Sequence, residues 1–286
     1  MYFFIYENIG NKRKFRKEAD RIQLQLANFG IADEHTESTP LRPINEIVKD
    51  ALKRNMSNII MVGSDKAAHI TINEMAKSKT PSCFGFIPMD TDSNIAKVLG
   101  MSHGHKACQD IAKRKIKDVD LGKVGQEYFL TTLRLNAGEE ETEIRGMFNR
   151  KAMPLPKSCT IKVPFKKQAI MTIPLREAMV VNISPYHKAG ELKIASEQSA
   201  KINPTDGRLD FFFLPSGEND PDVFKEFRQG SFTSTNISYF NRETLNINTN
   251  DKVQLVADGT KIKQFPINIE TVTGALRVIV GSNRMF

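Results

Sequence analysis

The sequence predicts two fold classes in one chain: α/β in the N-terminal part and all-β in the C-terminal part. In the first part, apolar runs alternate with segments of helical periodicity, which is typical of βαβ units and of a doubly wound, mostly parallel sheet. From about Val119 onward, short segments rich in β-branched and aromatic residues follow one another between turn residues. Strands at that spacing are typical of an antiparallel β-sandwich. We therefore expect two domains, residues 1–120 and 121–286.

The first domain is predicted from three apolar runs, at residues 2–6, 58–63 and 83–88. The last two are apolar at nearly every position, as expected for parallel strands that are buried on both faces. Helical spacing of apolar residues predicts helices at 12–29, from Pro43 through Leu52, and at 67–77, 94–100 and 105–115. Ligands bind to such sheets at the carboxyl ends of the strands. The loops after Ile5, Val62 and Ile87 therefore form the predicted binding edge.

The second domain is predicted as a series of strands with one inserted helix. The helix begins at Pro221, a residue favoured in the first turn, and ends at Arg228. The predicted strands are residues 127–134, 143–148, 159–165, 168–173, 178–183, 208–214, 231–239, 243–248 and 252–257.

Composition excludes several classes of protein. The 286 residues are 40% hydrophobic and 26% charged, which is ordinary for globular domains. No run approaches the roughly 18 apolar residues of a membrane helix, and the apolar start precedes the first basic residues, the reverse of a secretory signal. The three cysteines Cys83, Cys108 and Cys159 have no CxxC spacing. A disulfide framework or zinc site is therefore not expected, and a cytoplasmic location is.

The net charge of +8 suits an anionic membrane surface, a phosphorylated ligand or a nucleic acid. The chain has no Trp and only five Tyr, so aromatic platforms for single-stranded nucleic acid are not evident. We expect no nucleic-acid partner.

Four short segments contain the candidate chemical groups. Gly63-Ser64-Asp65-Lys66 follows the second apolar run, where small residues let backbone N–H groups approach an anion at a helix N-terminus. Residues 86–96, 201–211 and 256–260 hold further Asp, Asn, Ser and Thr side chains. Taken singly, each segment is explained by helix capping or by an Asp-Gly turn.

Together and in this order, the four segments resemble the diacylglycerol kinase catalytic family of bacterial lipid kinases, whose superfamily includes NAD kinases and sphingosine kinases. The family's Gly-Gly-Asp-Gly-Thr loop corresponds to residues 63–67, and its Ile-Pro-x-Gly-Thr-x-Asn-x-x-Ala motif to residues 87–96. Two family turns correspond to Asp206-Gly207-Arg208-Leu209-Asp210 and to Asp258-Gly259-Thr260. The resemblance also implies that a final strand, around residues 275–280, returns to the first domain.

The phosphate loop is degenerate by comparison with the family. Ser64 and Lys66 stand where two glycines allow positive φ and close backbone approach. Asp90 and Asp92 replace two further glycines and add negative charge, and Thr260 replaces an acidic residue. The family residues that remain are Gly63, Asp65, Thr91 and Asp258.

The resemblance implies a kinase that uses ATP and Mg²⁺ to phosphorylate a lipid hydroxyl. It implies Asp258 as the catalytic base, and Asp206 and Asp210 are candidates for a structural metal. The implied nucleotide-binding residues are Asn8, Gly63, Ser64, Asp65, Lys66 and Thr91. Expected partners are a nucleotide and a lipid substrate at the anionic inner face of the membrane, where the protein would bind peripherally. A second copy of the chain, in a homodimer, is a further candidate partner.

Because of the lost glycines, weakened kinase activity is part of this expectation. Two alternatives stay open. The first is a catalytically inactive relative that binds a nucleotide, a lipid head group or a protein. The second, weaker alternative is an NAD kinase-like activity.

Overall fold

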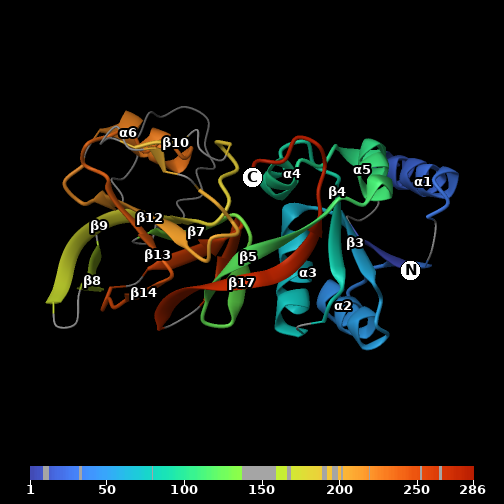
Figure 1. Ribbon diagram of the computed structural model, residues 1–286, viewed down its shortest axis with the longest axis horizontal. Coiled ribbons are helices and arrows are strands. Elements are labelled where there is room, and N and C mark those ends of the chain that lie inside the picture. The colour runs from blue at the N-terminus through green and yellow to red at the C-terminus, as the bar shows by residue number, and fades with distance from the viewer. Residues whose placement is uncertain are drawn as a thin grey trace, which may run out of the picture.

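The computed structural model describes residues 1–8, 13–31, 34–78, 80–136, 159–165, 169–188, 192–194, 199–200, 202–218, 220–251, 253–263 and 266–286. Two sheets follow one another along the longest axis of the molecule, and the last long strand runs between them (Figure 1). The predicted fold class is confirmed: one sheet is mixed with a parallel core, and the other is antiparallel.

The first sheet has the order β2-β1-β3-β4-β17-β5-β6, with β14 paired to β17. Its first four strands are parallel. They are β1 (Tyr2–Tyr6), β2 (Glu34–Glu37), β3 (Asn58–Gly63) and β4 (Cys83–Pro88). Every residue of β3 and β4 is buried, as their mostly apolar sequences predict.

Helices cover both faces of the parallel strands (Figure 1). On one face lie α1 (Arg13–Asn28), α4 (Asn94–Leu99), the short 3-10 helix η1 (Gly104–Lys106) and α5 (Ala107–Lys113). On the other lie α2 (Ile44–Lys53) and α3 (Asp65–Ser78). None of the described helices is long and apolar enough to cross a membrane.

Strand β17 (Ile267–Ile279) joins the two halves of the molecule. It pairs antiparallel with β5 (Ile116–Val124) and β14 (Thr244–Ile247). Its last residues pair in parallel with β4, with Arg277 opposite Cys83. This confirms that the final strand returns to the first sheet.

The second sheet has the order β13-β12-β9-β7-β15-β16, with β8 paired to β9, and all its pairs are antiparallel. Its strands are β7 (Thr132–Asn136), β8 (Cys159–Phe165), β9 (Ala169–Val181), β12 (Leu209–Pro215), β13 (Ser238–Arg242), β15 (Gln254–Ala257) and β16 (Thr260–Ile262). The remaining elements are β6 (Glu127–Phe129), the two-residue strands β10 (Leu192–Lys193) and β11 (Ser199–Ala200), and α6 (Pro221–Arg228).

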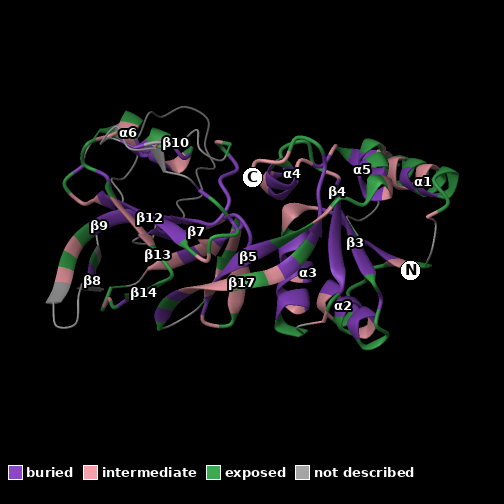
Figure 2. Ribbon diagram, in the orientation of Figure 1, coloured by how far each residue is buried: buried purple, intermediate pink, exposed green. Residues whose placement is uncertain are grey.

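Strand β12 is buried at every position except Pro215 (Figure 2). Its residues belong to two hydrophobic clusters, one on each face of the second sheet. Phe211 and Phe213 pack toward the first sheet, in a cluster that includes Ile269 of β17. Phe212 points to the opposite face and packs with Phe227 of α6 and Phe232. The period-2 alternation of the strand thus places its aromatic residues in two separate cores.

Several predicted boundaries are wrong. The predicted strand at 231–239 begins only at Ser238, because the preceding residues form turns that bury Phe232 and Ile237 under α6. Residues 127–134 divide between β6 and β7, while the two strands predicted at 168–173 and 178–183 are replaced by the single strand β9, Ala169–Val181. The strand expected at 143–148 lies outside the described residues.

The first sheet includes β5, which spans residue 120, and it also contains β6, β14 and β17 from later in the chain. The division into 1–120 and 121–286 stays a prediction.

Candidate functional site

The predicted binding edge lies where β1, β3 and β4 end side by side. The Glu7 N–H donates to the Val62 carbonyl at 2.9 Å, and the Met89 N–H donates to the Gly63 carbonyl at 2.9 Å. These bonds continue the parallel ladders past the strands, so the three loops begin next to one another.

The turn between β3 and α3 is filled by the side chain of Glu7. The Ser64 N–H donates to Glu7 Oε2 at 2.7 Å, and the Ser64 hydroxyl donates to Glu7 Oε1 at 3.0 Å. A Cβ atom on Gly63 would lie 2.6 Å from Glu7 Oε2, so only glycine leaves room for this carboxylate. Sequence reasoning missed Glu7; its place directly after the first strand was the available signal.

Asp65 is the first residue of α3, but its side chain caps α4. Its Oδ2 accepts the N–H groups of Asn94 at 2.8 Å and Ile95 at 3.4 Å, and its Oδ1 accepts the Ser93 hydroxyl. Burial raises the pKa of the Asp65 carboxyl, although these hydrogen bonds act in the opposite direction. Asp65 therefore ties the loop after β3 to the loop after β4.

The other predicted nucleotide-binding residues lie around this turn. The Asn8 N–H donates to Ser38 Oγ at 3.0 Å, at the end of β2. Lys66 is exposed in the first turn of α3. Thr91 is exposed and lines a cavity of about 580 Å³ between the β4–α4 loop and helices α1 and η1.

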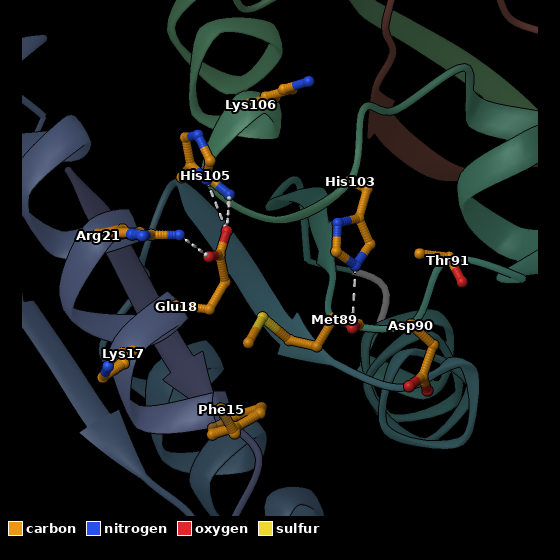
Figure 3. A pocket seen from close by; sticks show the side chains of 10 residues that line it. All are labelled: Phe15, Lys17, Glu18, Arg21, Met89, Asp90, Thr91, His103, His105 and Lys106. Carbon is orange, nitrogen blue, oxygen red and sulfur yellow. Dashed lines mark hydrogen bonds and ion pairs between the residues drawn. The ribbon is translucent and has the colours of Figure 1, made fainter. Parts of the chain in front are cut away.

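This cavity has both cationic and anionic walls (Figure 3). Glu18 accepts the His105 N–H at 2.9 Å, lies 2.7 Å from His105 Nδ1, and accepts Arg21 Nη1 at 3.4 Å. Burial acts to raise the pKa of Glu18, but the bonds from His105 and Arg21 outweigh it and the net shift is downward. The cavity is also lined by Phe15, Lys17, Met89, Asp90, Thr91, His103 and Lys106.

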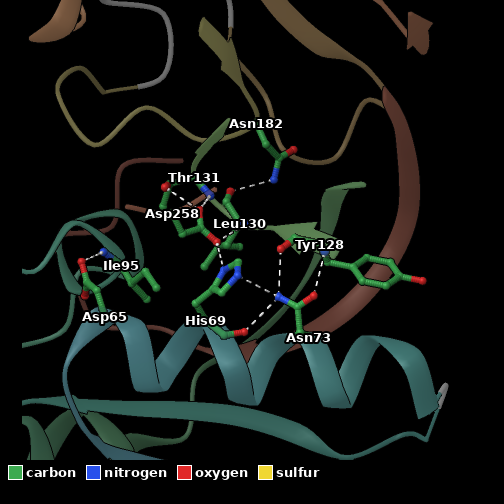
Figure 4. Close-up of polar contacts among 9 residues, drawn as sticks. All are labelled: Asp65, His69, Asn73, Ile95, Tyr128, Leu130, Thr131, Asn182 and Asp258. Atoms are coloured by element: carbon green, nitrogen blue, oxygen red, sulfur yellow. Dashed lines mark hydrogen bonds and ion pairs between the residues drawn. The ribbon is translucent and has the colours of Figure 1, made fainter. Parts of the chain in front are cut away.

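Asp258 lies in the turn between β15 and β16, with a φ of 47°, and its carboxylate is enclosed (Figure 4). Oδ1 accepts both the N–H and the hydroxyl of Thr131 at 2.7 Å. Oδ2 accepts the Leu130 N–H at 2.9 Å and lies 3.1 Å from Nδ1 of His69 on α3. The predicted catalytic base is thus a buried carboxylate with four hydrogen-bonding contacts to three residues.

The candidate metal ligands Asp206 and Asp210 differ in environment. Asp206 is exposed and accepts the Arg208 N–H at 2.9 Å. Asp210 is buried, accepts the Tyr239 hydroxyl at 2.6 Å, and has a raised pKa because of that burial. Within the described ranges, no group of three or more His, Cys, Asp or Glu side chains is arranged to hold a metal ion. The metal assignment stays a prediction.

Comparison with known proteins finds a matching family for the N-terminal part of the chain. Residues 1–124 match the diacylglycerol kinase catalytic domain. A diacylglycerol kinase of Bacillus subtilis (strain 168) is 23% identical over 128 residues, which make up 44% of this chain and 42% of that protein. The alignment therefore spans less than half of the curated relative.

Two crystal structures from Bacillus anthracis str. Sterne share the fold over nearly the whole chain. One is named a diacylglycerol kinase and matches with a TM-score of 0.73 and 17% identity, covering 98% of this chain and 97% of that one. The other, provisionally named a diacylglycerol kinase, matches with a TM-score of 0.76 and 16% identity over the same shares. Residues 1–124 thus match the diacylglycerol kinase catalytic domain, and the chain as a whole has the fold of these structures.

Proposed function

We propose that this protein is an ATP-dependent lipid kinase that phosphorylates the hydroxyl of a diacylglycerol-like lipid. The match of residues 1–124 to the diacylglycerol kinase catalytic domain carries the proposal. The joined loops after β1, β3 and β4 support it, because they occupy the edge where α/β sheets bind ligands. ATP and Mg²⁺ are proposed on family grounds.

The residues at this edge do not fit a triphosphate as they lie. The Ser64 N–H, which a glycine-rich loop would direct at phosphate, already donates to Glu7. Asp65 directs both of its oxygens at the start of α4.

A second candidate function is a non-catalytic relative that binds a nucleotide, a lipid head group or a protein. The enclosure of Asp258 favours it. A general base must reach the proton that it abstracts, whereas both oxygens of this carboxylate already have two partners each.

We further propose that the protein is cytoplasmic and reaches its lipid acceptor peripherally, at an anionic membrane surface. The net charge of +8 supports this, since basic side chains are attracted to anionic lipids. Co-sedimentation with vesicles of phosphatidylserine and with vesicles of phosphatidylcholine tests it. Equal binding to both would contradict it.

Calorimetry tests the nucleotide site by measuring how tightly MgATP binds to the wild type, to Asp65→Ala and to the control Asp92→Ala. The Asp92 side chain is 98% exposed, so its loss removes a nearby charge without opening the site. Binding that only Asp65→Ala abolishes, while circular dichroism shows that it is folded, supports a nucleotide at this loop. Transfer of label from γ-labelled ATP to diacylglycerol in mixed vesicles then tests the reaction. Its absence despite nucleotide binding would favour the non-catalytic function.

A further inference from the structure

Near the starts of three helices at the binding edge, a backbone N–H donates to a carboxylate side chain of the protein itself. Glu7 occupies the Ser64 N–H at the start of α3, and Asp65 occupies the Asn94 N–H at the start of α4. Glu18 occupies the His105 N–H in η1. Helix starts attract anions because their first N–H groups lack helical partners and because the helix dipole is positive there. At this edge the protein supplies those anions itself.

Glu7 differs from the other two carboxylates because of where it sits. Both of its oxygens bind one residue, Ser64, in the turn that corresponds to the phosphate loop of the family. Gly63 makes room for it: a Cβ there would lie 2.7 Å from the Cβ of Glu7 as well as 2.6 Å from Oε2. The surviving glycine of the loop therefore accommodates Glu7 in this conformation.

A phosphoryl group and the Glu7 carboxylate would compete for the same N–H group. Each is an anion that binds best by charge-assisted hydrogen bonds, and two anions at one amide repel each other. The Glu7 backbone is held separately, by its N–H bond to Val62. Its side chain is only partly buried, so it can leave the turn without breaking the β1–β3 ladder.

We propose that Glu7 gates this turn: its carboxylate excludes phosphoryl anions from the Ser64 N–H, and a nucleotide phosphate binds there only after Glu7 moves away. The inference rests on the proposed function, since it concerns the same nucleotide site. Glu7 lies outside the glycine-rich loop, so comparison of the loop sequence alone does not reveal it.

Glu7→Gln tests the gate, with Glu37→Gln as the matched control. Glu37 is exposed at the end of β2, directly opposite Tyr6 in the pairing, so its substitution removes the same charge from the same edge. Calorimetry would measure the affinity of each protein for MgATP and for pyrophosphate. We expect Glu7→Gln to bind both roughly tenfold or more tightly than wild type, which corresponds to losing a competing hydrogen bond to a charged group. Glu37→Gln should bind like wild type.

Glu7→Ala provides a second variant, because a Gln side chain at position 7 can still accept a hydrogen bond from Ser64 and so keep its place in the turn. The Ser64 amide resonance, followed by NMR during pyrophosphate titration, shows whether the anion binds at this turn. The gate is overturned if both Glu7 variants are folded and bind no more tightly than wild type. It is also overturned if Glu37→Gln gains as much, since long-range charge would then explain the effect. Tighter binding by the Glu7 variants without transfer to diacylglycerol would reject the kinase and leave the gate standing.

Discussion

His69 and Asp258, which are 189 positions apart, meet where α3 packs against the β15–β16 turn, with 3.1 Å between Nδ1 and Oδ2. The side chain of Asp258 is fully buried and that of His69 is 4% exposed. Because Asp258 also accepts the N–H groups of Leu130 and Thr131, it joins three separate segments of the chain. The carboxylate that the sequence predicts as the catalytic base thus links α3 of the first half of the molecule to the β15–β16 turn of the second.

Asp258→Ala should strongly destabilise the fold. It would leave the Leu130 and Thr131 N–H groups buried without an acceptor and His69 without its partner. Each buried donor left without an acceptor typically costs about 1–3 kcal/mol, and urea denaturation would measure the summed loss. Asp92→Ala, on the surface, should change the free energy of unfolding by less than about 0.5 kcal/mol. An Asp258→Ala protein as stable as that control would show that the contact is energetically unimportant.

The contribution of Asp258 to the free energy of unfolding should also depend on pH. Burial acts to raise its pKa, but the bonds from His69, Thr131 and Leu130 outweigh it, and the pKa lies below the ordinary value of 3.8. A carboxyl with a lowered folded-state pKa stabilises fully above its unfolded-state pKa and loses that contribution as the pH falls through the folded-state pKa. The difference in unfolding free energy between wild type and Asp258→Asn should therefore be constant from about pH 7 to 5 and shrink below about pH 4. A difference that stays unchanged down to about pH 3 would contradict the lowered pKa.

The elements that could be predicted are those whose own sequence is enough to fix their type and their bounds. The predicted bounds of β3 and β4 are confirmed because both strands are apolar at nearly every position and end at Gly63 and Pro88. Strand β2 was not predicted because its sequence Glu-His-Thr-Glu has no buried face and forms by pairing with β1. Local pattern cannot reveal a strand that depends on its neighbour.

The candidate site was predictable only as a set of loops. The pattern of strands placed Gly63, Asp65 and Thr91 at one edge, and the fold brings the loops that hold them together. The partner of each polar side chain was not predictable, because hydrogen bonding between segments 57 or 189 positions apart depends on packing. Glu7 and His69 were missed for that reason.

Asn73→Ala should weaken the contact between α3 and β6. The Asn73 side chain donates to the Tyr128 carbonyl at 3.0 Å and accepts the Tyr128 N–H at 2.8 Å, as one strand pairs with another. Loss of both bonds removes the partners of two partly buried backbone groups, at a cost of about 1–3 kcal/mol. Amide hydrogen exchange should show faster exchange at Tyr128 than in wild type.

Asn73→Asp is the matched variant for this contact. It keeps the acceptor for the Tyr128 N–H and loses the donor to the carbonyl. Protection of the Tyr128 amide should therefore be retained better in Asn73→Asp than in Asn73→Ala. Equal exchange in all three proteins would show that the contact does not hold β6 in place.

Gly100→Ala should destabilise the protein more than Gly30→Ala, although both glycines have a φ of 67°. The backbone strain is therefore similar at the two positions, about 1–2 kcal/mol for a residue other than glycine. A Cβ on Gly30 would have nothing within 4 Å, whereas one on Gly100 would lie 2.2 Å from the backbone nitrogen of Arg284. The chain end must then move, and forced displacement in a packed region costs about 1–3 kcal/mol more.

The same comparison tests whether the C-terminal segment is anchored on α4. The Gly281 and Met285 N–H groups donate to the carbonyls of Leu99 at 2.9 Å and Val98 at 3.0 Å. Displacement by Gly100→Ala should break these bonds, so amide exchange at Gly281 and Met285 should accelerate in that variant and not in Gly30→Ala. Equal unfolding free energies for the two variants would mean that the C-terminal segment moves at no measurable cost. The segment would then contribute little to the stability of the first sheet, even though it directly follows β17.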